Sequence, residues 1–312
     1  MDARKLSALY GLKWNPFLED IPLEALCETP RIKHFAWRVE DLVMHGGFAL
    51  VTGDVGAGKS AALRLLAAKL SPLRDVMVGE VTRPQSRVTD FYRELGDLFG
   101  LAISGSNRWG AYKTVRAKWQ EHIQQTLFRP VLLIDEAQEM SPPLLAELRL
   151  LGSTKLDTCT IVTVVLCGDR RLEEKLRTPD LLPVHSRIRT RLVLDAESPD
   201  VLGTMLRHTL AAAGNAALMT DELQRTVCEH AAGNRRVLMN LCNEMLVLAV
   251  AKNAKRLDES LYLELTNADH RPSRANAAPT RAKPARRPIS STTWFTSTTL
   301  TIAAASNGWP IS

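Results

Sequence analysis

Five runs of consecutive apolar residues, separated by amphipathic stretches, most restrict the folds open to this chain. The runs are rich in Val, Leu and Ile and do not alternate with polar residues, which is typical of strands buried on both faces of a parallel sheet. Because strand-like and helical segments alternate, we predict an α/β fold with a parallel sheet and crossover helices. The runs are "GFALVTG" (47–53), "VMVGEV" (76–81), "PVLLIDE" (130–136), "TIVTVVLCG" (160–168) and "TRLVLD" (190–195).

The strand-like runs stop near residue 196, and the next segment has a helical pattern. Ser198 is a typical N-cap, Pro199 suits the first helical turn and Gly214 suits a helix end. From residue 270 the composition changes to Arg, Pro, Ala, Ser and Thr, which bury too little apolar surface to fold. We therefore predict an α/β core over 1–195, a helical lid over 196–268 and a disordered basic tail over 269–312.

The basic character of the chain comes from its C-terminal end. The formal net charge is +6, and the six Lys and Arg residues after residue 269, which have no acidic residue among them, account for all of it. The five cysteines are scattered without the spacing of a zinc site, so we expect reduced thiols. No run reaches the ~18 apolar residues of a membrane span, and the N-terminus lacks a secretory signal. We expect a cytoplasmic protein with no membrane contact.

The stretch "GDVGAGKS" fits the phosphate-loop pattern G-x-x-x-x-G-K-[ST] and lies between a predicted strand and a predicted helix. Glycines let backbone N–H groups approach the phosphates, and the following helix presents its positive end to them. Lys59 is expected to reach the β- and γ-phosphates, and Ser60 to bind Mg²⁺. The predicted nucleotide-binding residues are Gly53, Asp54, Val55, Gly56, Ala57, Gly58, Lys59, Ser60 and Ala61.

Two carboxylates follow the third predicted strand, in "LLIDE". Asp135 emerges at the carboxyl edge of the sheet, where phosphate ligands bind in such folds, and is predicted to hold Mg²⁺. Glu136 is predicted to orient and polarise the attacking water. Together with the phosphate loop, this pair predicts ATP hydrolysis with Mg²⁺ as cofactor.

Arginines in two places could act on the nucleotide phosphates. Arg187, just before the last predicted strand, could stabilise charge on the γ-phosphate of a neighbouring subunit. Arg236 lies at the predicted start of a lid helix, which itself attracts anions. Of Arg235 and Arg236 at this helix start, we predict that Arg236 contacts the γ-phosphate, and we prefer this role over a surface role.

The order of these motifs is similar to that in the AAA+ ATPases, and the residues within them resemble those of the ExeA/TniB branch. The resemblance spans about residues 6–267 and is carried by "YGLKWNPF" (10–17), "LLIDEAQ", "LCGDRRLEEKLRTPDLLPVHSRIRTRLVL" and "GNRRVLMNLCNEMLVLA". It implies that the Asn-Pro-Phe segment packs near the adenine, that Arg187 acts in trans and that Arg236 is the sensor 2 arginine. The sensor 1 position holds Asp169 instead of a neutral polar residue, so we expect Asp169 to be paired with Arg170, Arg171 or the metal.

The resemblance leaves more than one function open. One is a helper ATPase of DNA transposition, like TniB, TnsC and MuB, which assembles with ATP on DNA as a ring or filament and recruits a transposase or integrase. We favour this function because the sequence lacks the membrane span of ExeA-type secretion-assembly ATPases. That secretion function and a signalling switch that does not use DNA are the alternatives. Non-sequence-specific DNA contacts are predicted at Lys155, Arg170 and Arg171.

Overall fold

The computed structural model describes residues 3–81, 87–103 and 107–269. All of these belong to one compact unit, Met1–His270. The predicted disordered tail, apart from its first residue, lies outside the described residues. No helix within the described ranges is long and apolar enough to cross a bilayer.

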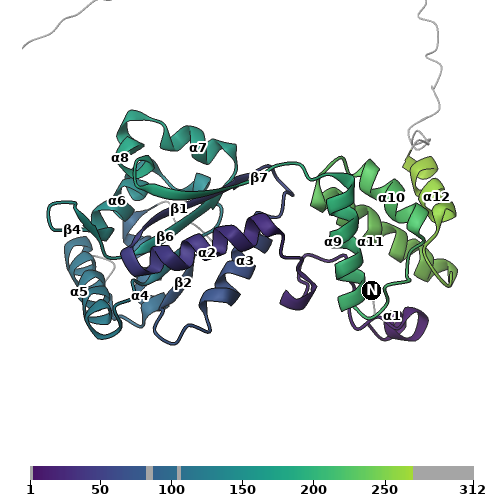
Figure 1. Cartoon of the computed structure of the whole chain (residues 1–312), viewed down its shortest axis with the longest axis horizontal. Helices are drawn as coiled ribbons and strands as arrows, with labels where there is room; N and C mark the ends of the chain where they lie inside the picture. Colours follow the sequence, from purple (N-terminus) through teal and green to yellow (C-terminus); the bar gives the residue numbers. More distant parts are fainter. Residues whose placement is uncertain (1–2, 82–86, 104–106, 270–312) are drawn as a thin grey trace, which may run out of the picture. The chain divides into compact units, whose positions relative to one another are not determined.

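A five-stranded parallel sheet forms the core, in the order β2-β3-β6-β1-β7 (Figure 1). This confirms the predicted α/β fold class. Each predicted run contributes one strand, although some begin at other residues than expected. The strands are β1 (Gly47–Gly53), β2 (Val78–Val81), β3 (Val131–Ile134), β6 (Thr163–Gly168) and β7 (Ile188–Leu194).

Alternate residues of the central strands explain why their sequences are continuously apolar. Leu132 and Ile134 pack into a hydrophobic cluster on one face of the sheet, and Val131 and Leu133 pack into another on the opposite face. Successive side chains of a strand point to opposite faces, so a strand covered on both sides needs apolar residues throughout.

Helices cover both faces of this sheet. Side chains of α2 and α3 contribute to one cluster, and side chains of α4, α5, α6 and α7 contribute to the other. The bounds are α2 (Pro30–His45), α3 (Lys59–Leu70), α4 (Val88–Phe99), α5 (Arg108–Thr126), α6 (Pro142–Gly152), α7 (Arg170–Leu176) and α8 (Leu182–His185). Of three short 3-10 helices, η1 (Leu23–Ala25) precedes α2, η2 (Ala137–Glu139) precedes α6, and η3 (Pro179–Leu181) precedes α8.

The start of the fourth predicted strand forms a separate small hairpin. Residues 159–160 are β5 (Cys159–Thr160), which pairs antiparallel with β4 (Ser153–Thr154). Three successive residues between them, Lys155, Leu156 and Asp157, have positive φ angles of 48°, 56° and 70°. This turn reverses the chain after α6, so the sheet strand itself begins only at Thr163.

The C-terminal helices form a third hydrophobic cluster. They are α9 (Pro199–Ala212), α10 (Asp221–His230), α11 (Arg235–Lys252) and α12 (Glu259–Asp269). As predicted, Ser198 caps the first of them through a hydrogen bond from Val201 N. The N-terminal helix α1 (Ala3–Tyr10) also belongs to this cluster, through Leu6 and Tyr10, whereas the sequence suggested grouping these residues with the core.

Candidate nucleotide-binding site

The phosphate loop connects β1 to α3, in the strand–loop–helix arrangement that its sequence requires. Gly56 and Gly58 have φ angles of +83° and +96°, a region in which residues with a Cβ are strained. These angles turn the backbone between the end of β1 at Gly53 and the start of α3 at Lys59.

The lid touches this loop directly. Asn234 caps α11 and donates a hydrogen bond from Nδ2 to the Val55 carbonyl at 3.0 Å, and Arg236 N donates to the Gly56 carbonyl at 3.3 Å. A Cβ at Gly56 would lie 2.3 Å from Asn234 Oδ1, and one at Gly58 would lie 2.6 Å from Arg235 Nη1. Both glycines therefore also make room for the lid.

Gly56→Ala should weaken nucleotide binding about 10- to 100-fold, because backbone strain of ~1–3 kcal/mol and the clash with Asn234 would both distort the loop. Gly100→Ala is the matched control, since Gly100 also has a positive φ of 64° but open space around its Cβ position. Titration with a fluorescent ADP analogue measures the effect. Equal affinities of the two variants would contradict a requirement for this close approach.

Lys59 and Ser60 both contact the edge of the sheet. The Lys59 side chain is buried, and its Nζ donates to the carbonyls of Gly53 and Asp54, both at 3.1 Å. Ser60 Oγ donates to Asp135 Oδ2 at 2.8 Å. The structure thus brings together the hydroxyl and the carboxylate predicted to hold Mg²⁺, and these hard oxygen ligands suit that ion.

Glu136 follows Asp135 and lines the same cavity as the phosphate loop. Its φ is +50°, an uncommon angle for a non-glycine residue that recurs at functional sites. Glu136 N donates to Asp135 Oδ1 at 2.9 Å, and Glu136 Oε2 accepts a hydrogen bond from Gln138 Nε2.

Asp169 is paired as the sequence suggested, and Arg171 is its partner. The Asp169 carboxylate accepts hydrogen bonds from Arg171 N and Nε, both at 2.9 Å. Partial burial alone would raise the pKa of Asp169, but the hydrogen bonds and the charge of Arg171 outweigh it and hold the pKa below its ordinary value. The carboxylate is therefore a compensated anion at the edge of the cavity.

Both lid arginines line the cavity but differ in their surroundings. Arg235 is buried and pairs with Glu197 at 2.9 Å. Arg236 is half exposed and lies 3.5 Å from Glu19, which is itself strongly exposed. An exposed ion pair of this kind contributes little, so Arg236 is the lid arginine with the greater freedom to contact a phosphate.

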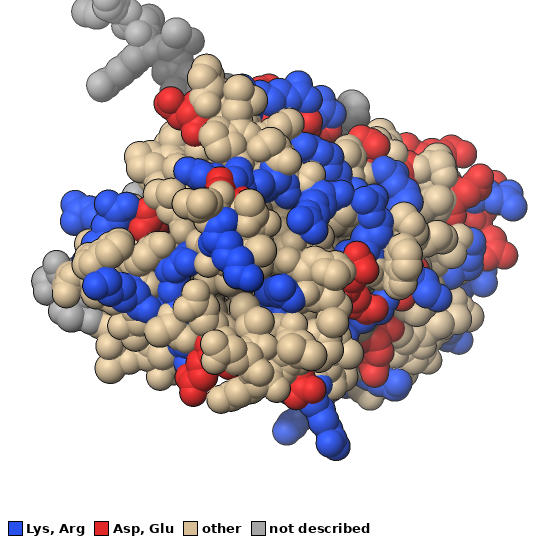
Figure 2. Space-filling model, turned by 60° about the vertical axis from the view of Figure 1, so that its left-hand side comes forward, with Lys and Arg blue, Asp and Glu red and all other residues tan. Residues whose placement is uncertain are grey.

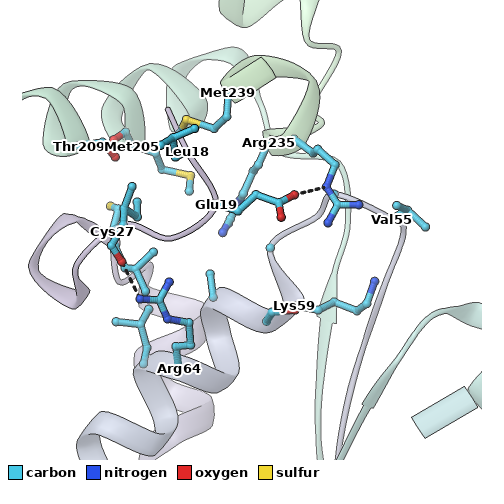
Figure 3. Close-up of a pocket in the computed structure, with 18 of the residues that line it drawn as sticks. Leu18, Glu19, Cys27, Val55, Lys59, Arg64, Met205, Thr209, Arg235 and Met239 are labelled. Carbon is cyan, nitrogen blue, oxygen red and sulfur yellow. Dashed lines mark hydrogen bonds and ion pairs between the residues drawn. The ribbon is translucent and has the colours of Figure 1, made fainter. Parts of the chain in front are cut away.

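The rest of the cavity is mainly apolar. Met205 and Met239 come from the lid, and Leu18 comes from the N-terminal segment (Figure 3). Phe17 of the same segment also lines the cavity. This segment is tied to α3 because Arg64 Nη2 donates to the Ile21 carbonyl at 2.6 Å. The cavity volume of about 450 Å³ lies within the ~300–1,000 Å³ usual for small-molecule sites.

Arg187 does not line the cavity. It precedes β7, and its carbonyl accepts a hydrogen bond from Phe48 N near the beginning of β1, whereas the phosphate loop follows the other end of β1. A strand of this length spans about 20 Å. The Arg187 guanidinium donates to Asp157 of the β4–β5 turn and to the Pro183 carbonyl. Within one chain Arg187 is thus far from the phosphate loop.

The predicted DNA contacts are not brought together. Arg170 pairs with Asp54 at 2.8 Å and Arg171 with Asp169 and Glu139, so both lie beside the nucleotide cavity. Lys155 is exposed in the β4–β5 turn, before β6 rather than after it. Among the described residues Lys155 has no ion pair.

Sequence reasoning did not single out three residues that shape the site. Asn234 could have been found, because an Asn before a helix-forming run is an N-cap signal. Glu197 pairs with Arg235 across 38 positions of sequence, and Gln138 joins segments 31 positions apart. Such long-range pairs leave no signal in the spacing of a single sequence.

Comparison with known proteins identifies the type of domain. Residues 42–176 match the family model described as an AAA domain. General secretion pathway protein A from Aeromonas hydrophila is 28% identical over 260 residues, which cover 80% of this chain and 45% of the relative. The chain therefore spans less than half the length of this curated relative.

Solved structures with low sequence identity share the fold. The Aeropyrum pernix ORC2 protein in its ADP form has a TM-score of 0.66 at 14% identity, over 83% of this chain and 73% of that one. The Aeropyrum pernix ORC1 protein in complex with DNA has a TM-score of 0.60 at 16% identity, over 81% and 68%. The fold is thus the AAA+ P-loop fold.

Proposed function

We propose that this protein hydrolyses ATP and assembles on DNA in its ATP-bound state, as a helper of a transposase or integrase. The convergence of the phosphate loop, Glu136 and the two lid arginines on one cavity carries the ATPase part of this proposal. Assembly and DNA binding rest on the position of Arg187 and on the resemblance to transposition ATPases.

In this proposal, ATP occupies the cavity with its base against the methionines of the lid and its phosphates on the loop. Lys59 turns from the carbonyls of Gly53 and Asp54 to the β- and γ-phosphates. Ser60 and Asp135 would hold Mg²⁺, which would supply positive charge to offset that of the phosphate oxygens. Glu136 accepts a proton from the attacking water, and ADP and phosphate are the products.

Assembly follows from the distance between Arg187 and its own phosphate loop. A contact of Arg187 with a γ-phosphate would have to come from another copy of the chain. Negative charge that develops on that γ-phosphate would compete with the Asp157 carboxylate for the Arg187 guanidinium. ATP would therefore favour a ring or filament, whereas ADP would not.

Of the three predicted DNA contacts, Lys155 is the one that we would test first. Arg170 and Arg171 pair with acidic residues near the cavity, whereas Lys155 has no ion pair among the described residues and lies beside the fully exposed Leu156. In Figure 2 the side of the molecule that carries α5 and β4 in Figure 1 is turned forward. Many Lys and Arg side chains lie on this face. In an assembly, repetition of such a face would add many weak phosphate contacts.

Duplex DNA binding in three nucleotide states tests the proposal. We expect the full chain to bind with a non-hydrolysable ATP analogue and much less with ADP or no nucleotide. The affinity should fall steeply between about 50 and 200 mM salt and depend little on sequence. Lys155→Ala should weaken binding, and Lys252→Ala on the lid, which removes the same charge, should not. Equal or absent binding in all three states at low salt would exclude the DNA function.

The relative from Aeromonas supports a second candidate, an ATPase of secretion assembly. Its name places it in a general secretion pathway, and the similarity covers most of this chain. This candidate shares the ATPase mechanism but predicts no DNA binding. ATP turnover without DNA binding in any nucleotide state would favour the secretion candidate.

A further inference from the structure

Gln138 is a buried polar residue that the mechanism above does not use. It lies in η2, directly after Glu136, and its side chain does not line the cavity. Only 5% of Gln138 is exposed, and a buried amide must find partners for both of its polar atoms.

The two ends of the amide join two separate parts of the site. Oε1 accepts a hydrogen bond from Asp169 N at 3.2 Å, at the end of β6, and Nε2 donates to Glu136 Oε2, after β3. A backbone N–H can only donate and an ionised carboxylate can only accept, so these partners fix the orientation of the amide.

Two further contacts keep this bridge in place. A Cβ at Gly168 would lie 2.5 Å from Gln138 Oε1, so the glycine makes room for the amide. Lys175 of α7 donates from Nζ to the carbonyls of Gln138, at 2.5 Å, and Met140, at 2.9 Å. Side chain and backbone of η2 are thus both attached to the segment that follows β6.

We infer that Gln138 is a positioning residue that fixes the Glu136 carboxylate and makes its position depend on Asp169. With Oε2 held by the amide, Oε1 is the oxygen left for water. Glu136 is exposed and its backbone is strained, so without the amide its side chain would sample other rotamers. A shift of the Asp169 segment on phosphate binding would pull on Gln138 Oε1 and move Glu136. This inference rests on the proposed role of Glu136 as base.

Two variants separate the hydrogen bond to Glu136 from the one to Asp169. Gln138→Met keeps the side-chain length and removes both, while Gln138→Glu keeps an acceptor for Asp169 N and loses the donor. We expect both to lower kcat about 10- to 100-fold, since a misplacement of ~1 Å can cost 10²-fold. The affinity for a fluorescent ADP analogue should change less than about twofold. Gln224→Met is the matched control, because Gln224 is an equally buried glutamine in the lid, 4% exposed.

A double-variant comparison decides whether Gln138 acts through Glu136. In single-turnover assays, Gln138→Met should lower the rate of the wild type but not that of Glu136→Gln. Normal turnover in both Gln138 variants, or an equal loss in the Glu136→Gln background, would overturn the inference. Normal turnover in Gln138→Glu alone would mean that only the hydrogen bond to Asp169 N matters. That result would also overturn the inference. If Glu136→Gln itself leaves turnover unchanged, the proposed base is wrong and the inference falls with it.

Discussion

Glu136→Gln should lower ATP turnover by ~10²–10⁴-fold, the usual contribution of a general base. The glutamine keeps the size of the side chain but cannot accept the proton of the attacking water. Nucleotide affinity should remain, because the phosphate loop, Lys59 and the apolar side of the cavity are unchanged. Single-turnover hydrolysis, together with titration of a fluorescent ATP analogue, measures both quantities.

Glu139→Gln is a suitable control for this prediction. Glu139 is an exposed carboxylate in η2, the short helix that follows Glu136. It pairs with Arg171 and does not line the cavity. We expect it to change turnover by less than about threefold, in line with the small value of an exposed ion pair. Unchanged turnover in purified Glu136→Gln would remove Glu136 as the base.

Local patterns in the sequence predicted the sheet because each central strand carries its own signal. Val131 to Ile134 are apolar on both faces, and the phosphate loop marks where β1 ends and α3 begins. The strand starts were harder to predict. The apolar run at 160–168 begins in the β4–β5 hairpin, which precedes β6. Nothing in the run itself separates its first residues from the sheet.

Pairings across the chain were harder to predict than motifs. The sequence suggested a cationic partner for Asp169, and the structure selects Arg171, two residues on, because the carboxylate also caps α7. The packing of α1 against α11 places Leu6 and Tyr10 in the cluster of the lid helices, which no local period indicates. The same limit applies to Gln138, whose partners lie after two different strands.

Arg187→Ala should lower ATP turnover by ~10³–10⁵-fold if this arginine acts on the nucleotide of a neighbouring copy, as trans-acting arginines do. It should leave nucleotide binding intact, because Arg187 does not contact the cavity of its own chain. Arg191→Ala is the matched control. Arg191 is exposed on β7, the strand that follows Arg187, and its guanidinium lies 3.1 Å from His185 Nε2. Its removal should change turnover little.

Mixing variants tests whether the site is shared. An Arg187→Ala chain still offers an intact cavity, and a Lys59→Ala chain still offers an intact Arg187, so a mixed assembly contains interfaces in which both halves work. We expect the mixture to recover a measurable part of the wild-type rate, although each variant alone is nearly inactive, and wild-type activity per chain to fall on dilution. Because Asp157 holds Arg187 in the isolated chain, this recovery should also require an ATP concentration that favours assembly. Activity independent of dilution, with no recovery on mixing, would show that the site is complete within one chain.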